Sequence, residues 1–279
     1  MCDVFIWSWH YMRDGAANSM TRVFGGKCKS KARLDGKVVV ITGCNTGIGK
    51  ETALEFYKRG ARVVMACRNV EKAKSAEKDI KRETEGLINV GEIIVKELNL
   101  ASFKSIRQCA DDILASENHI HFLVNNAGVM MCPRELTEDG HELQFGTNHL
   151  GHFLFTMLLL PRIIKSAPAR IVNLSSLAHT WGDGDMHFDD ITLEKSYSPT
   201  AAYGRSKLAN ILFTNELAKR LQVIASRGHP LRERETKLRP SSFGSTVGAQ
   251  WDYLRITIHS SKDRTSMRQR VSCQLRIYI

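Results

Sequence analysis

The chain has 279 residues, of which 43% are hydrophobic, and this is enough apolar sequence to build one substantial core in a single α/β domain. Its formal net charge of +11 is concentrated at the two ends: six basic residues face two acidic ones in 1–33 and 11 face four in 223–279, whereas 34–222 holds 23 of each. The seven cysteines are scattered and lack C-x-x-C spacing, so neither a disulfide framework nor a metal site is predicted and a reducing compartment is favoured.

The N-terminal arm, residues 1–33, begins with twelve mainly apolar and aromatic residues that Asp3 interrupts. This stretch is shorter than the roughly 20 residues that span a bilayer, and no signal peptide is evident. The basic residues that follow favour peripheral contact with an anionic membrane surface, and a frayed, solvated arm fits equally well. We therefore expect an intracellular protein, either cytoplasmic or at the cytoplasmic face of a membrane.

The first element of the domain is the stretch 37–50, KVVVITGCNTGIGK. Residues 38–41 have the β-branched character of a buried strand, and a helical spacing begins at Ile48 and ends near Gly60. Gly43, Gly47 and Gly49 lie between them, where backbone can approach a pyrophosphate at the N-terminus of a helix. The spacing GxxxGxG differs from the commoner GxGxxG, and a tight turn without a ligand is the alternative.

Strands and helices then alternate at a regular pace. Strands are predicted at 61–66, 92–98, 120–124 and 170–174, and helices at 69–85, at 102–115 with Ser102 as cap, at 139–160 and at 200–222. Pro161 is expected to kink or end the third of these helices. This order predicts a doubly wound parallel sheet of Rossmann type over residues 34–222.

The segment 223–279 has a different character. It contains many serines and threonines and no sustained helical period, and only residues 253–258 resemble a strand. We expect an atypical, poorly ordered basic tail, with the C-terminal strands of the sheet missing or replaced. A nucleic-acid or anionic-membrane binder is an alternative, but aromatic residues are not interleaved with the charges, so no specific nucleic acid is expected.

The residues that suggest chemistry follow the later strands. Tyr203 and Lys207 are four residues apart and share one face of a helix, where an ammonium group favours the phenolate form of a tyrosine. An ordinary solvated Tyr and Lys pair is the alternative. Ser176 ends the fifth strand, where a hydroxyl can bond a substrate oxygen, and Asn148 lies inside the long helix. His149 and His152 are interpreted as packing or hydrogen-bonded residues.

These motifs together resemble the short-chain dehydrogenase/reductase family. The resemblance rests on TGCNTGIG at 42–49, NNAG at 125–128, Asn148, Ser176 and Tyr203-x-x-x-Lys207, and RSKLANILFTNELAKRL resembles the retinol dehydrogenase branch. It implies hydride transfer between a nicotinamide and an alcohol or carbonyl carbon. Tyr203 would be the acid/base, Lys207 would bind the ribose and tune Tyr203, Ser176 would position the substrate oxygen, and Asn148 would hold a water.

The resemblance also implies a set of cofactor-binding residues. Besides Tyr203 and Lys207, these are Gly43, Asn45, Thr46, Gly47, Ile48, Gly49, Arg68, Asn99, Asn126, Ala127 and Gly128. Arg68 stands near the end of the second strand, where NAD-specific proteins place an acid, so NADP(H) is favoured over NAD(H), with Lys50 as an extra charge. Asn99 replaces the usual Asp of the adenine pocket.

The predicted function is therefore that of an NADP(H)-dependent oxidoreductase acting on a small apolar alcohol, aldehyde or ketone of retinoid type. The sequence is compatible with a homo-oligomer. The family's sixth strand and Pro-Gly turn are not legible after Gln222. A catalytically impaired isoform of the same fold is the alternative, because losing those elements would open the site to water.

Overall fold

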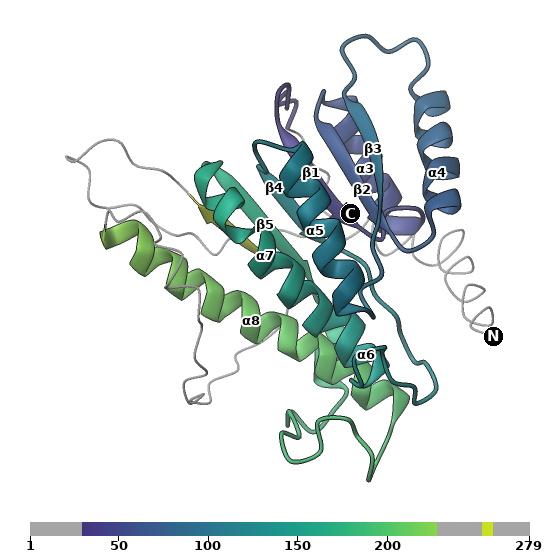
Figure 1. Ribbon diagram of the computed structural model, residues 1–279, viewed down its shortest axis with the longest axis vertical. Coiled ribbons are helices and arrows are strands. Elements are labelled where there is room, and N and C mark those ends of the chain that lie inside the picture. The colour runs from purple at the N-terminus through teal and green to yellow at the C-terminus, as the bar shows by residue number, and fades with distance from the viewer. Residues whose placement is uncertain (1–29, 228–252, 259–279) are drawn as a thin grey trace.

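The computed structural model describes residues 30–227 and 253–258, and its centre is one mostly parallel sheet (Figure 1). The strand order is β3-β2-β1-β4-β5-β6. The strands are β1 (Val38–Thr42), β2 (Arg62–Cys67), β3 (Glu92–Glu97), β4 (Phe122–Asn125), β5 (Ala169–Leu174) and β6 (Tyr253–Ile258). The first five are parallel, and β6 pairs antiparallel with β5. The predicted doubly wound sheet is confirmed.

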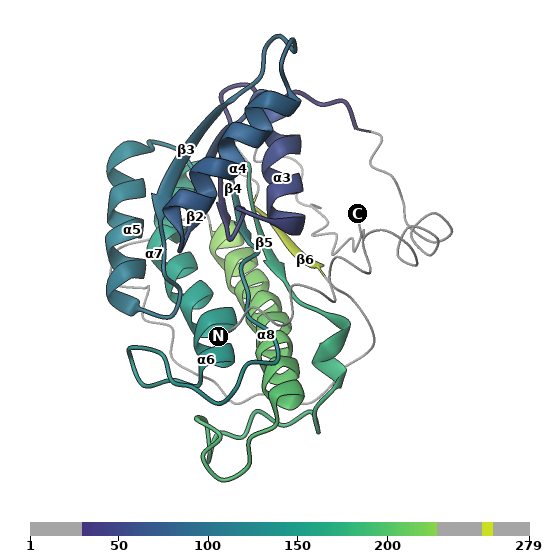
Figure 2. The same ribbon diagram turned by 90° about the vertical axis from the view of Figure 1, so that its right-hand side faces the viewer.

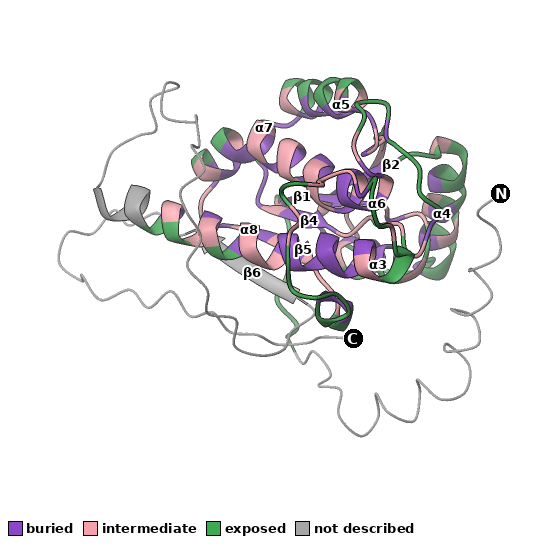
Figure 3. Cartoon of the chain, turned by 90° about the horizontal axis from the view of Figure 1, so that it is seen from below, coloured by how far each residue is buried: buried purple, intermediate pink, exposed green. Residues whose placement is uncertain are grey.

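Helices cover both faces of the sheet, and Figure 2 shows the sheet between them. On one face lie α5 (Phe103–Ser116), α7 (Gly151–Lys165) and α8 (Pro199–Arg227), whose buried residues share a core with β1 and β4. On the other face lie α3 (Gly47–Lys58) and α4 (Val70–Glu83). Figure 3 shows that the outer side of α5 is exposed, as expected for an amphipathic surface helix.

The strand order reverses between β1 and β4, and this places two loops side by side. The glycine-rich turn follows β1, and the loop 125–128 follows β4, which pairs with β1 in parallel. In open α/β sheets, ligands bind outside the carboxyl ends of the strands at such a reversal. The fold therefore brings the two motifs to the position where a dinucleotide would bind.

Most predicted boundaries agree with the structure within a few residues, but the long helix was predicted wrongly at both ends. Leu136 and Glu142, on either side of Asp139, form an isolated β-bridge, and helical structure begins with α6 (Leu143–Phe145). A π-helical turn, η2 (Gly146–Leu150), then leads into α7. Pro161 does not end α7, which continues to Lys165, because its ring lies on the exposed side and water can satisfy the carbonyl left without a donor.

The C-terminal prediction is tested only in part. The helix predicted to stop at Gln222 runs to Arg227, and the strand predicted at 253–258 is present as β6. The rest of the tail, like residues 1–29 of the basic arm, lies outside the described residues. Within the described part, no helix combines the length and apolar character needed to cross a bilayer.

Candidate active site

The glycine-rich turn packs directly against the loop after β4. Gly43 has φ +63°, and a Cβ there would lie 2.7 Å from the Cα of Ala127; a Cβ on Gly49 would lie 2.5 Å from Nδ2 of Asn126. Asn126 Nδ2 donates to the carbonyl oxygens of Thr42 (2.9 Å) and Gly43 (3.0 Å). These two glycines are thus required by a contact within the protein, because any side chain would push the two loops apart.

The first turn of α3 remains available to an anion. Thr46 is the N-cap residue, but its side chain makes no capping hydrogen bond to the backbone N–H groups that follow. Asn45 and Gly47 are half-buried, and Thr46 and Ile48 are exposed. Unsatisfied N–H groups at a helix N-terminus bind phosphate well, so the residues present fit a dinucleotide.

Near the end of β2, Arg68 is exposed and has no ion pair with any described residue, so its guanidinium is open to a ligand. Lys50, expected as an extra charge there, forms an ion pair: its Nζ lies 2.7 Å from Oδ2 of Asp79. The Oδ1 atom of Asn99 accepts a hydrogen bond from the N–H of Ala101 at 3.1 Å, which fixes the side chain after β3.

Lys207 lies under the ring of Tyr203 on α8. Its Nζ is 5.5 Å from the ring centroid and donates to the carbonyl of Leu174 at 3.2 Å. Only 4% of Lys207 is exposed, and this burial lowers its pKa to about 8. The amine is thus still mostly an ammonium at neutral pH, beside a half-buried phenol.

Asn148 lies in the π-helical turn and joins the site to its surroundings. Its Oδ1 accepts from the N–H of Val129 (2.8 Å), and its Nδ2 donates to the carbonyl of Val129 (2.9 Å) and to Oγ of Ser206 (3.0 Å). A Cβ on Gly128 would lie 3.2 Å from Oδ1 of Asn148 and 3.6 Å from Nζ of Lys207. The structure therefore brings Asn148, Gly128 and Lys207 together.

Ser176 caps the short helix η3 (Leu177–Thr180), which packs on α8. Its Oγ accepts a hydrogen bond from the N–H of Ala178 at 3.2 Å. The carbonyl oxygen of Ala178 would lie 2.5 Å from a Cβ on Gly204, the residue after Tyr203. The ring of Trp181, just beyond η3, lies 6.4 Å from the ring of Tyr203. The structure thus brings the strand-end serine to the helix that carries the tyrosine.

Two buried residues that were not predicted as part of the site connect its halves. The Thr42 hydroxyl accepts from the N–H groups of Asn126 (2.9 Å) and Ala127 (3.0 Å), so its own hydrogen is donated to Nε2 of His152 at 2.9 Å. His152 then carries its proton on Nδ1, which lies 2.9 Å from the carbonyl oxygen of Asn148. Burial lowers the His152 pKa to about 4, which keeps the ring neutral.

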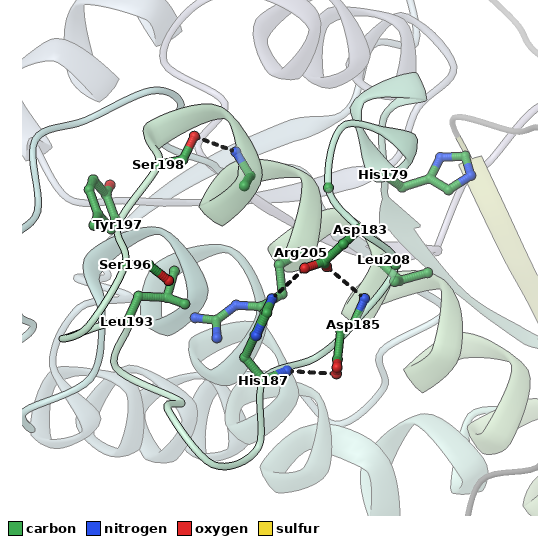
Figure 4. Close-up of a pocket in the computed structure, with 13 residues that line it drawn as sticks. His179, Asp183, Asp185, His187, Leu193, Ser196, Tyr197, Ser198, Arg205 and Leu208 are labelled. Atoms are coloured by element: carbon green, nitrogen blue, oxygen red, sulfur yellow. Dashed lines mark hydrogen bonds and ion pairs between the residues drawn. The ribbon is translucent and has the colours of Figure 1, made fainter.

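A cavity of about 250 Å³ lies between α8 and the loop 182–198 (Figure 4). Ala201, Arg205 and Leu208 line it from α8. At helical spacing these residues lie on a different face from Tyr203 and Lys207. The cavity is therefore separate from the pair Tyr203 and Lys207, neither of which lines it.

Comparison with known proteins agrees with this geometry. The short chain dehydrogenase family model matches residues 37–187. Retinol dehydrogenase 12 of Mus musculus is 54% identical over 218 residues, which cover 77% of this chain and 67% of the relative. Retinol dehydrogenase 13 of Homo sapiens is 50% identical over 234 residues, which cover 81% of this chain and 69% of the relative.

Solved structures show the same fold. A Mycobacterium paratuberculosis protein aligns with TM-score 0.58 and 40% identity over 72% of this chain and 67% of its own. A metagenomic short-chain oxidoreductase in complex with NADP aligns with TM-score 0.54 and 28% identity over 68% of this chain and 77% of its own.

Proposed function

The chain belongs to the short-chain dehydrogenase family of oxidoreductases, and we propose that it is an NADP(H)-dependent enzyme acting on an apolar alcohol or carbonyl compound of retinoid type. The observation that carries the proposal is the buried ammonium of Lys207, 5.5 Å from the centroid of the Tyr203 ring. A lysine is rarely buried without an ion-pair partner unless its charge is used.

The residues of the two loops would hold the cofactor. The first turn of α3, from Gly47, would bind the pyrophosphate, and Arg68 would bind the phosphate on the adenosine ribose. Asn99, which follows β3, and Asn126, Ala127 and Gly128, which follow β4, would contact the cofactor between these positions and Lys207. A solved relative in complex with NADP supports this choice of cofactor.

The protein's own groups would manage the proton. When bound, the nicotinamide supplies or accepts the hydride. In carbonyl reduction the Tyr203 hydroxyl donates its proton to the substrate oxygen, and the Lys207 ammonium stabilises the phenolate that remains. The Ser176 oxygen accepts the Ala178 N–H, which leaves its hydroxyl hydrogen free to bond the same substrate oxygen.

Exposed apolar side chains support an apolar substrate. Leu177, which directly follows Ser176, is 56% exposed, and Trp181, beside Tyr203, is 50% exposed. Met130 follows Val129, whose backbone is bonded to Asn148, and is 44% exposed. Large hydrophobic groups at the rim of a site favour a ligand that buries them. The retinol dehydrogenases among the relatives point to a retinoid in particular.

The direct test is a titration of the purified full chain with NADPH and then with NADH, followed by turnover with retinal. We expect NADPH to bind more tightly and to be consumed when retinal is added. A short water-soluble aldehyde serves as the control and should be reduced less efficiently. Binding of neither dinucleotide would contradict the proposal, and binding without turnover would leave a dinucleotide-binding protein that is not an active reductase.

A further inference from the structure

Two buried cysteines lie side by side directly next to the proposed cofactor-binding residues. The Sγ atoms of Cys44 and Cys67 lie 3.8 Å apart, and both side chains are buried, with 0% and 1% exposed. A disulfide holds its sulfurs at about 2.05 Å. The two sulfurs would have to approach by less than about 2 Å to form one.

The sheet itself creates this pair. Thr42 is in register with Ala66, and the N–H of the next residue, Gly43, donates to the Ala66 carbonyl at 2.9 Å. The chain continues beside β2 for one more step before it turns, so Cys44 arrives next to Cys67 at the carboxyl ends of β1 and β2. Backbone hydrogen bonds thus hold the two residues next to each other.

The two thiols differ in the way that a redox pair requires. The hydrogen bond between Cys67 and Cys44, together with backbone N–H groups of the glycine-rich turn, lowers the pKa of Cys67. Burial raises the pKa of Cys44 well above its ordinary value. The thiolate is the form that reacts with peroxide, so Cys67 would react first and Cys44 would resolve the product.

The other two described cysteines, Cys109 and Cys132, are not arranged for oxidation. Burial raises the pKa of Cys109 to about 12, which makes it inert toward oxidants. Cys132 is also buried, and its Sγ lies 3.8 Å from the carbonyl oxygen of Met130. Within the described part of the chain, Cys44 and Cys67 are therefore the pair arranged for oxidation.

We propose that Cys44 and Cys67 form a reversible disulfide that switches off dinucleotide binding; the effect on binding rests on the proposed function. The Cys67 thiolate attacks hydrogen peroxide and takes one oxygen as a sulfenic acid, with release of water after protonation. The Cys44 sulfur then displaces a second water from that sulfur as the S–S bond forms. Two thiols are oxidised, and one peroxide is reduced to two waters. A dithiol reductant reverses the reaction by thiol–disulfide exchange.

The bond would deform the cofactor loop. The Cα of Cys44 would lie 2.8 Å from a Cβ on Gly49, so the turn is packed against the start of α3 without slack. Drawing Cys44 toward β2 moves the turn relative to the first turn of α3, where the phosphate would bind. Cys67 is followed directly by Arg68, so the same bond also restrains the proposed 2′-phosphate contact.

The test treats the reduced full chain with hydrogen peroxide, with and without saturating NADPH. Free thiols are then alkylated, and the peptides are mapped without reduction. We expect a linked peptide that joins Cys44 to Cys67, slower linkage in the presence of NADPH, and a loss of NADPH affinity of roughly tenfold or more that dithiothreitol reverses.

Two variants control for general oxidation. Cys44→Ala removes the resolving thiol and should abolish the linked peptide and the dithiothreitol-reversible loss of affinity. Cys132→Ala removes a buried thiol outside the pair and should respond as the unmutated chain does. No linked peptide at a peroxide dose that oxidises other thiols, or linkage with unchanged NADPH affinity, would overturn the proposal. Reduced protein that binds no NADPH would overturn the proposed function and the switch together, whereas the linked peptide reports on the disulfide independently.

Discussion

Lys207 is the residue at which stability and function oppose each other most clearly. It is 4% exposed, has no carboxylate partner among the described residues, and has a pKa lowered by burial from 10.5 to about 8. The unfolded chain binds the lysine proton more tightly than the folded chain between about pH 8 and pH 10.5. The free energy of unfolding therefore rises with pH through this window, and the buried charge costs stability at neutral pH.

Replacing this charge should stabilise the protein. The pKa shift corresponds to about 3 kcal/mol, so Lys207→Met should raise the free energy of unfolding near pH 7 by up to about 3 kcal/mol, and the gain should shrink toward about pH 10. Urea denaturation at several pH values measures this difference. Lys219 is an exposed lysine on the same helix, and Lys219→Met should show no such pH dependence. An equal loss of stability in Lys207→Met at every pH would contradict the assignment of a costly buried ammonium.

Arg68 decides the predicted preference between the two dinucleotides. It is exposed and without an ion pair in the described part of the chain, so Arg68→Asp replaces an attraction for the 2′-phosphate by a repulsion. A charge-assisted hydrogen bond contributes about 1.5–3 kcal/mol, so NADPH affinity should fall by roughly 10- to 100-fold, with NADH affinity little changed. Lys78→Asp makes the same charge change on the exposed side of α4 and should have little effect. Isothermal titration of the three proteins with each dinucleotide measures the six affinities. Equal NADPH and NADH affinities in the unmutated chain would show that Arg68 does not select the cofactor.

Among the elements, the π-helical turn η2 determines how the long helix meets the sheet. An extra residue in the turn leaves the carbonyl of Asn148 to accept side-chain hydrogen bonds from His152 (2.9 Å) and Asn210 (3.2 Å). Such bulges occur often at functional sites. Through His152 and Thr42, this turn is tied to the loop 125–128 on the other side of β1.

The hydrogen bonds that connect β1 to α7 through Thr42 and His152 predict that substitutions at these two residues have non-additive effects on stability. Thr42→Val leaves the N–H groups of Asn126 and Ala127 without their acceptor, and His152→Phe leaves the Thr42 hydroxyl without its own. Each change should cost about 1–3 kcal/mol of stability, and the double variant should cost less than the sum by roughly 0.5–3 kcal/mol. Denaturant unfolding of the four proteins gives this interaction energy. Thr84→Val, a buried substitution at the end of α4, serves as the control: its loss of stability should simply add to that of His152→Phe. Additive losses for Thr42→Val and His152→Phe would contradict the connection.

Helix and strand boundaries could be predicted from the sequence where local signals dominate. Asn69 and Ser102 cap α4 and α5 with their side chains, and the β-branched run before Gly43 forms β1. The start of the long helix could not be predicted, because a β-bridge between Leu136 and Glu142 competes with the helical pattern. Pro161 was misleading for a similar reason, since only the tertiary structure places it on the solvent side of α7.

At the scale of the whole molecule, the sheet order explains why the site could be predicted in outline. Motifs that follow β1, β4 and β5 must meet at the carboxyl ends of a parallel sheet, so Asn126 and Ser176 could be grouped from the sequence. Tyr203, which lies on α8, was added to this group by the family resemblance. Contacts between side chains of different elements could not be predicted from the sequence. Lys50 pairs with Asp79 on α4, and Cys44 meets Cys67 across two strands, at sequence separations that no local pattern reveals.

The central claim is that Tyr203 passes the proton in an NADP(H)-dependent reaction, and retinal turnover by Tyr203→Phe tests it most directly. The substitution keeps the ring over Lys207 and against Trp181 while it removes the hydroxyl. The claim predicts that the single-turnover rate constant of retinal reduction is lower in Tyr203→Phe than in the unmutated chain by roughly 10² to 10⁴. The affinity for NADPH should be nearly unchanged. Normal turnover by a Tyr203→Phe protein that binds NADPH would contradict it.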